Sequence, residues 1–343
     1  MCPERLPCPK SESTHVCDTV IHLCAILLAI GIVAQSAAAH STGAFDNQIK
    51  NNSLAVSPNE AIAVVSYSDE PNVLVYDLKS GTVRAKLTGF VTPRNIVFAP
   101  DGARFYISDS GTGRITSFNS TSLKPNGQLA AGPGVFGTTI SADGTKLYAN
   151  NQAASTVTVY DLKADKTHAV IMGFAQPRQG VRLGPDGKQL YVTNFLGDKI
   201  TLVDTATDKI IGEIGGFDKI RAISITSDGK KLYAANSGSN SIAIVDPETR
   251  KITDTVKVGE DPYGAALTSD GRFVYSGNLK GNSLSVIDTA SAKVVATVTG
   301  LNEPRQAIVF SKDGSRAFVL NRDLSIAVVD RATNTVASTL RAK

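Results

Sequence analysis

The architecture of this chain is set by the segment Asp186-Gly187-Lys188-Gln189-Leu190-Tyr191-Val192-Thr193-Asn194, because variants of it recur at regular intervals. Its Asp-Gly pair lies between two apolar runs, which is a strong hairpin signal since both residues tolerate positive φ. The pair recurs with spacings of 42 or 43 residues, and Pro58-Asn59 takes its place in the first unit. The equivalent aspartates are Asp101, Asp143, Asp186, Asp228, Asp270 and Asp313. The chain therefore contains seven repeats.

Each repeat predicts four short strands. In the fifth repeat, Ala222-Ile223-Ser224-Ile225 precedes the Asp-Gly pair, Leu232-Tyr233-Ala234-Ala235-Asn236 follows it, and Ile242-Ala243-Ile244-Val245-Asp246 alternates. A shorter and more polar run, such as Lys293–Val298 in the next repeat, ends the unit as an outermost strand should. A period of 40–45 residues with several strands is typical of propeller blades, which bury both faces by stacking in a ring. We predict an all-β fold, a single seven-bladed β-propeller of four-stranded blades, over residues 54–343.

Residues 1–53 differ from the repeats. Val20–Ala34 is a mostly apolar run, and Ala37 and Ala39 fit a cleavage site. A membrane-spanning helix needs about 20 apolar residues, so we predict a signal peptide over residues 1–39 and export to the periplasm or secretion. An uncleaved anchor is the alternative, and acidic residues before the run leave the true start residue open. Within the N-terminal segment 40–53, Ala44–Lys50 either adds a strand to the last blade or lies across one face.

The residues that are missing exclude several chemistries. Every cysteine precedes residue 40, and only His40 and His168 remain after the predicted cleavage. Thiolate nucleophiles, haem attachment and sites with several imidazoles are therefore excluded from the mature chain. No P-loop or dinucleotide fingerprint occurs, and the innermost strands carry none of the carboxylates with which propeller lactonases hold a metal. We predict no enzyme activity, no cofactor and no metal site; copper at His40 is a minor alternative to a disordered terminus.

A row of Asp or Asn residues ends the third strand of every repeat. Short carboxylates in this position accept hydrogen bonds from turn amides, so we interpret the row as structural and not as a metal site. Its members are Asp77, Asn119, Asp161, Asp204, Asp246, Asp288 and Asp330.

Arginine recurs where the fourth strand of one repeat passes to the first strand of the next. Pro93-Arg94, Pro177-Arg178, Arg221 and Pro304-Arg305 occupy these crossings, and Pro262-Tyr263 does so in the sixth repeat. In a propeller the crossings lie on one face, around the mouth of the central channel. The arginines are therefore predicted to form a cationic collar that holds phosphate or carboxylate groups. Pairing with neighbouring carboxylates is the alternative.

Aromatic residues accompany the arginines. Phe90, Phe174 and Phe217 lie just upstream in the same loops, and Phe195 follows a second strand. Basic groups interleaved with rings are what sequence-tolerant single-strand binding requires. The alternative is that Phe90, Phe174 and Phe217 fill the seams between blades. The predicted ligand-binding residues are Arg94, Arg178, Arg221, Tyr263, Arg305, Phe90, Phe174, Phe195 and Phe217.

Tyr191-Val192-Thr193-Asn194 is also the motif that names the YVTN-type β-propeller repeats. With the Pro-Arg, Asp-Gly and Val-Asp-Thr elements around it, the chain resembles that family over residues 54–341, and is most similar to the YncE-like periplasmic seven-bladed propellers. The resemblance implies a binding or surface protein, and the YncE-like branch implies an association with single-stranded DNA. This motif indicates the fold far more specifically than it indicates the function.

We therefore predict an exported, non-catalytic binding protein whose Arg-rich face holds an anionic ligand, such as single-stranded DNA or another polyanion. Such binding weakens steeply with salt. A protein-interaction scaffold in the cell envelope is the alternative, and a propeller lactonase or hydrolase is the least favoured hypothesis. We expect a monomer with no membrane span after cleavage. The ligand and the way the ring closes stay open.

Overall fold

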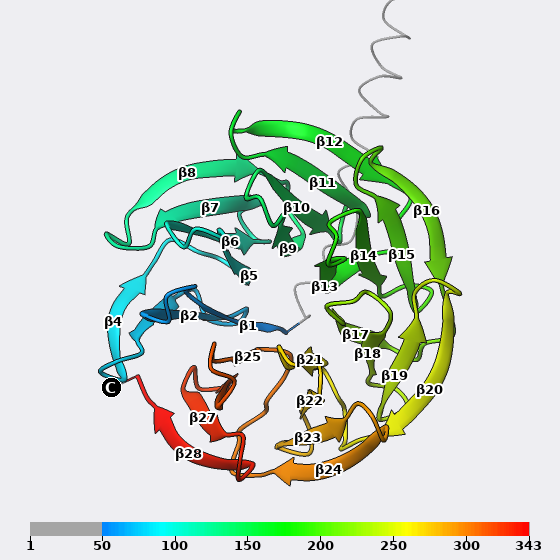
Figure 1. The fold of residues 1–343 in the computed structure, drawn as a ribbon. Coiled ribbons are helices and arrows are strands. Elements are labelled where there is room, and N and C mark those ends of the chain that lie inside the picture. The colour runs from blue at the N-terminus through cyan, green and yellow to red at the C-terminus, as the bar shows by residue number, and fades with distance from the viewer. Residues whose placement is uncertain (1–49, 343) are drawn as a thin grey trace, which may run out of the picture. The chain divides into compact units, whose positions relative to one another are not determined.

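The Asp-Gly turns form the hairpins that the repeat predicts. At the turn of the fourth repeat, Gly187 has a φ of 70°, which a residue without a side chain adopts at no steric cost. The strands on either side pair in antiparallel register, with Leu183 opposite Leu190. The computed structural model describes residues 50–342, and this part of the chain consists of strands and turns only (Figure 1).

The strands form seven antiparallel sheets of four, each in chain order. The first three blades comprise β1 (Asn52–Val56), β2 (Ile62–Tyr67), β3 (Val73–Asp77), β4 (Thr82–Leu87), β5 (Pro93–Phe98), β6 (Arg104–Asp109), β7 (Arg114–Asn119), β8 (Pro125–Ala130), β9 (Val135–Ile140), β10 (Lys146–Asn151), β11 (Thr156–Asp161) and β12 (Lys166–Met172). The next two comprise β13 (Pro177–Leu183), β14 (Gln189–Asn194), β15 (Lys199–Asp204), β16 (Lys209–Ile214), β17 (Ile220–Ile225), β18 (Leu232–Asn236), β19 (Ser241–Asp246) and β20 (Lys251–Lys257). The last two comprise β21 (Ala266–Leu267), β22 (Phe273–Asn278), β23 (Ser283–Asp288), β24 (Lys293–Val298), β25 (Ile308–Phe310), β26 (Arg316–Leu320), β27 (Ile326–Asp330) and β28 (Thr335–Leu340). The predicted seven-bladed propeller is confirmed.

The core lies in the seams between blades. Seven clusters of buried apolar residues each join two adjacent blades, because the faces of every sheet carry the apolar residues of its second and third strands. One example packs Ile200 and Leu202 of β15 against Ile223 of β17. The first strand of each blade lines the centre of the ring and the fourth lies at the rim (Figure 1).

The ring closes by side-chain packing between complete blades. All four strands of the seventh blade come from residues 308–340, and β1 is the inner strand of the first blade. One cluster joins Tyr76 and Leu54 to Phe318 across this seam, and the Tyr76 hydroxyl donates to the Leu324 carbonyl at 2.8 Å. No strand of residues 50–342 is shared between the two blades. Most of Ala44–Lys50, for which an extra strand was one hypothesis, lies outside the described residues.

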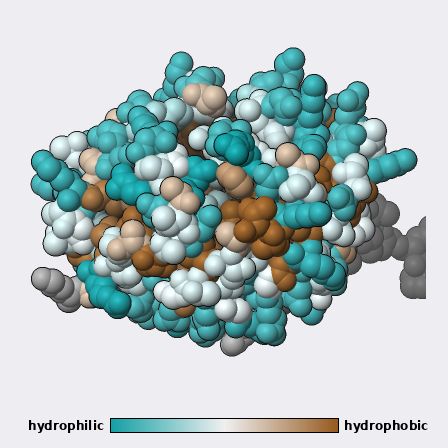
Figure 2. Space-filling model, turned by 60° about the horizontal axis from the view of Figure 1, so that its bottom comes forward, coloured by the Kyte–Doolittle hydropathy of each residue, from teal (hydrophilic) through white to brown (hydrophobic). Residues whose placement is uncertain are grey.

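The outer surface is mixed in polarity. Figure 2 shows brown hydrophobic residues gathered in the middle of a mostly hydrophilic face. Outer strands β16 and β24 carry exposed apolar side chains, among them Ile211 and Val295, so these rims are less polar than expected for outermost strands. Residues 50–342 contain no helix with the length and apolarity needed to cross a membrane. The predicted signal peptide lies outside the described residues.

Candidate functional site: a cationic pocket at the centre of the ring

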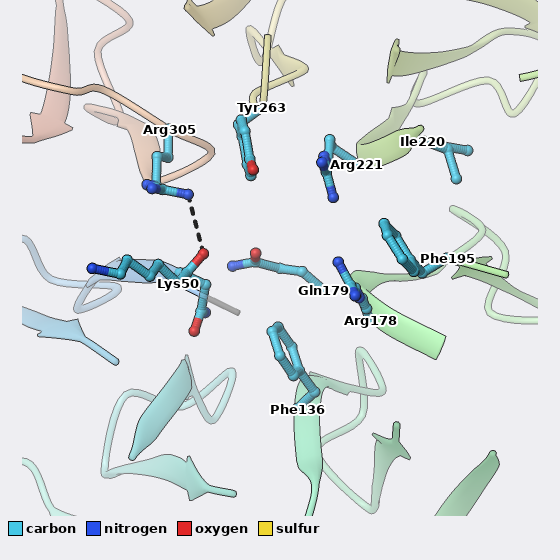
Figure 3. A pocket seen from close by; sticks show the side chains of 10 residues that line it. Lys50, Phe136, Arg178, Gln179, Phe195, Ile220, Arg221, Tyr263 and Arg305 are labelled. Atoms are coloured by element: carbon cyan, nitrogen blue, oxygen red, sulfur yellow. Dashed lines mark hydrogen bonds between the residues drawn. The ribbon is translucent and has the colours of Figure 1, made fainter. Parts of the chain in front are cut away.

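A cavity of about 340 Å³ opens at the centre of the ring. Three arginines, one lysine and three aromatic residues line it, and none of its lining residues within positions 50–342 carries a carboxylate. Figure 3 shows these side chains arranged around Gln179, which lies in the middle, with the Lys50 ammonium pointing away from the centre. The lining residues are Lys50, Asn51, Phe136, Arg178, Gln179, Phe195, Ile220, Arg221, Tyr263 and Arg305.

The repeat brings these residues together. Phe136, Arg178 and Arg221 are each the second residue of an inner strand, in β9, β13 and β17. Tyr263 and Arg305 hold the corresponding crossings in the next two blades, and Lys50 and Asn51 precede β1. The start of the inner strand lies at the channel mouth, so residues from distant parts of the sequence become neighbours there. Arg305 and Lys50 are 255 positions apart, yet the Arg305 guanidinium donates to the Lys50 carbonyl at 3.0 Å.

Arginines and aromatic rings alternate along the pocket wall. The guanidinium carbon of Arg178 lies 3.3 Å from the centroid of the Phe195 ring, and that of Arg221 lies 5.6 Å from the same ring. Arg221 and Arg305 lie 4.6 and 4.8 Å from the Tyr263 centroid. Stacking on a ring fixes the plane of a guanidinium while leaving its in-plane N–H groups available to an acceptor.

Buried Tyr67 continues this wall beyond Arg305. Its ring centroid lies 5.8 Å from the Arg305 guanidinium carbon and 4.1 Å from that of Arg322. Burial raises the pKa of the Tyr67 hydroxyl, which stays a neutral phenol at physiological pH. The two guanidinium groups therefore gain no counter-charge from this side chain.

Arg221 and Arg305 have polar contacts but no acidic partners. The Arg221 Nε donates to the Ser237 hydroxyl at 2.9 Å. Arg305 is only 6% exposed, and its Nε has no hydrogen-bond partner within residues 50–342. Neither side chain forms an ion pair with a carboxylate of the described chain. A buried cation of this kind costs free energy unless an anion joins it.

Arg94 has a different role from the one expected. It is fully buried, its Nε donates to the Ser110 hydroxyl at 2.8 Å, and its Nη1 donates to the Asn51 Oδ1 at 3.1 Å. Its guanidinium carbon lies 4.6 Å from the centroid of Phe136, which does line the pocket. Arg94 therefore supports the wall from behind, so the collar consists of Arg178, Arg221 and Arg305. Lys50 also lines the pocket, but its Nζ lies 3.0 Å from an Asp69 carboxylate oxygen.

Phe90, Phe174 and Phe217 do not line the pocket. Each is at most 9% exposed and packs in a cluster between two blades. The placement of these three rings in the binding site is corrected: they fill seams, because the loop between blades turns its aromatic residue into the apolar gap that adjacent sheets leave. Phe195 and Tyr263 are the predicted aromatic residues that reach the pocket.

The pocket floor was not predicted from the sequence. Gln179 reaches across the middle of the cavity (Figure 3), and its Nε2 donates to the Asn52 carbonyl at 3.2 Å. Gln306 donates to the Asn52 side-chain oxygen at 2.9 Å. An Arg-Gln pair recurs at both places, Arg178-Gln179 and Arg305-Gln306, and this recurrence was the available signal.

The Asp and Asn residues that end the third strands lie far from the pocket, in turns. The Asp204 Oδ1 accepts from the Thr207 amide at 2.8 Å, and the Asp330 Oδ1 accepts from the Thr333 amide at 2.9 Å. Within residues 50–342 no three His, Cys, Asp or Glu side chains gather as metal ligands would. His168 lies in rim strand β12 with its Nε2 3.3 Å from an Asp208 oxygen.

Fold and site together define a seven-bladed β-propeller with an arginine- and aromatic-lined pocket at the mouth of its channel. A family model described as "Lactonase, 7-bladed beta-propeller" matches residues 46–219 and 207–310, and the chain belongs to this family.

No curated protein matches the chain. Among solved structures, a chain of "Kuenenia stuttgartiensis Hydrazine Synthase" is similar in fold, with a TM-score of 0.65, 20% identity, and coverage of 73% of this chain and 86% of that one. At this identity the likeness extends to the fold alone.

Proposed function

We propose that this chain is an exported, non-catalytic binding protein that holds a compact anionic ligand, a carboxylate or phosphate compound, in the central pocket. The observation that carries the proposal is the charge of the wall: Arg221 and Arg305 line the cavity without an ion pair to a carboxylate of residues 50–342, and Arg178 adds a third guanidinium. A volume of about 340 Å³ is at the lower end of the range for small-molecule sites.

The same wall favours a compact anion over single-stranded DNA, which the resemblance to YncE-like propellers suggested. Base stacking needs free ring faces. Phe195 and Tyr263 each have two guanidinium groups within 6 Å of the ring centroid, and Phe90, Phe174 and Phe217 are buried in seams. Phosphate contacts at the collar stay open to a nucleic acid, but stacking contributes little.

Hydrolysis of a lactone is the second candidate, because the family description names this activity. Opening a lactone with water calls for a general base or a bound metal that activates the water. Within residues 50–342, the pocket lining offers arginines that would stabilise an oxyanion, but no carboxylate or imidazole. Binding without turnover is therefore the better-supported function.

The first test is calorimetric titration with citrate, inorganic phosphate and oligo(dT), over a salt series. We expect saturable binding of at least one small anion, steep weakening with salt, and at least a tenfold loss in the double variant Arg221→Gln/Arg305→Gln, since charge-assisted bonds contribute about 1.5–3 kcal/mol each. Arg104→Gln is the matched control, because Arg104 is an exposed arginine at the start of β6 that does not line the pocket.

The other outcomes are equally informative. Tighter binding of oligo(dT) than of small anions would favour the nucleic-acid ligand. Absence of binding to all three probes at low salt would refute the proposal and leave the envelope scaffold, whose partner is sought by co-purification. Turnover of aliphatic lactones that depends on Arg221 would establish the hydrolase.

A further inference from the structure

The central channel continues beyond the pocket floor. Gln179 lines both the pocket and a second cavity of about 300 Å³, and a third cavity of about 280 Å³ adjoins the second. The second and third cavities share Arg182, Ala222, Gln306, Ile308 and Val309. Arg182 lies four residues after Arg178 in β13, which at ~3.3 Å per residue places it up to roughly 13 Å further along the strand and deeper in the channel.

Arg182 is the only charged residue among those lining these two cavities. Its single hydrogen bond within residues 50–342 runs from Nη1 to the carbonyl of its own neighbour Val181, at 2.8 Å. Arg182 is exposed to solvent within the channel, although the surrounding strands desolvate it enough to lower the pKa of its guanidinium. The fold thus places a cation in the channel, and no carboxylate of residues 50–342 pairs with it.

The two cavities around Arg182 are lined by uncharged polar side chains, among them Ser224 and Gln306, and by aliphatic ones. Leu267, Ile308 and Val309 contribute aliphatic side chains to the third cavity. Ser224 lines the same cavity, and its buried hydroxyl has no hydrogen-bond partner within the described residues. A guanidinium, an unused donor and an aliphatic wall are complementary to a short-chain carboxylate, whose charged end and apolar body need opposite surroundings.

We propose that the channel contains a second anion site, built on Arg182, for a small monocarboxylate with an aliphatic body. The carboxylate accepts from the Arg182 guanidinium and the Ser224 hydroxyl, and the hydrocarbon part packs on Ile308 and Val309. The hydrogen-bonded floor of Gln179, Asn52 and Gln306 separates this site from the collar. The two sites therefore bind independently, and this inference does not rest on the function proposed for the collar.

The test uses butyrate as the probe and butyramide as its neutral counterpart, at constant ionic strength, with calorimetry and thermal unfolding as readouts. We expect butyrate to bind at least tenfold more tightly than butyramide and to raise Tm. Arg182→Met abolishes both effects, Arg182→Lys retains part of them, and Arg221→Gln at the collar leaves them unchanged. Without ligand, Arg182→Met changes Tm by less than about 2 °C, because Arg182 is exposed to the solvent of the channel and has no ion pair within residues 50–342 to lose.

Three results would overturn the site. Equal binding of butyrate and butyramide would show that charge is not recognised. Butyrate binding lost in Arg221→Gln but kept in Arg182→Met would place the ligand at the collar, which supports the proposed function and refutes this one. A large fall in Tm for both Arg182 variants would show that the side chain stabilises the fold.

Discussion

At the scale of single residues, the aspartates of the six Asp-Gly turns share one structural task. Each accepts from the backbone amide two residues further on. Where a Ser or Thr stands two residues before it, the aspartate also accepts from that hydroxyl, as Asp143 does from Ser141 at 2.5 Å. Asp313 accepts in the same way from Ser311 and Ser315. These bonds favour the ionised form, and they lower the pKa of Asp143 and of Asp313 to about 2.

These two residues contribute to the pH dependence of stability, together with other turn aspartates whose pKa is lowered, such as Asp204 and Asp228. A folded-state pKa of about 2 lies below the ordinary 3.8, so the stabilisation is complete above pH ~4 and is lost as the pH falls towards 2. We expect Tm to fall over this window, and Asp143→Asn/Asp313→Asn to lower Tm at pH 6 and to flatten the fall. Thermal unfolding at a series of pH values measures both effects. A curve parallel to that of the unchanged protein, or the same flattening in the exposed control Glu248→Gln, would contradict this.

At the scale of elements, the pocket wall depends on how closely β22 approaches the crossing that carries Arg305. Gly277 occupies the place that Ala235 and Thr193 hold in equivalent strands. A Cβ on Gly277 would clash with the Arg305 carbonyl oxygen and approach its backbone nitrogen to 3.2 Å. The Arg305 backbone can therefore lie this close to β22 only because position 277 has no side chain.

We expect Gly277→Ala to lower the free energy of unfolding by about 2 kcal/mol and to weaken anion binding, because the added methyl group displaces the Arg305 segment. Urea unfolding and calorimetric titration measure the two effects. Gly215→Ala is the matched control, since a Cβ there meets no atom within 4 Å. Unchanged stability and affinity in Gly277→Ala would show that the Arg305 segment moves freely.

At the scale of the whole molecule, the ring has seven similar seams. Each is sealed by one apolar cluster, and the closing seam between the seventh and first blades is of the same kind. Outer and inner strands of successive blades are joined by short segments, such as residues 215–219 between β16 and β17. No blade borrows a strand from another within residues 50–342, so the closing seam differs in connectivity from the other six only in having no linking segment between its two blades.

A circular permutant tests this equivalence. Residues 216–342, a linker of about five residues similar in length and composition to the segments between blades, and residues 50–215 form a chain that opens at exposed Gly215-Gly216. We expect it to fold to the same ring, with a Tm within about 5 °C of residues 50–342 alone, by circular dichroism and calorimetry. Failure to fold, while residues 50–342 fold, would show that the original closing seam has a special role.

The all-β class, the seven blades, the four strands in each, and the side of the ring where Arg178, Arg221, Tyr263 and Arg305 gather could all be predicted from the sequence. The fold could be predicted because hairpin turns and strand alternation are local sequence patterns. Their sevenfold repetition then indicates a ring of seven similar blades. Which of these side chains face the cavity is determined by tertiary packing. Arg94 and Arg178 share a Pro-Arg motif, yet Arg94 is buried against Phe136 while Arg178 lines the pocket.

The reason is that orientation at the channel mouth depends on contacts between blades, which no single repeat encodes. Bulges shift the register of β5, β13 and β17 near their first residues, so equivalent positions turn by different amounts. The rings of Phe90, Phe174 and Phe217 are apolar, and they pack in the seams between blades. Arg182 is not distinguished by any sequence pattern, since its isolation inside the channel exists only once seven inner strands surround it.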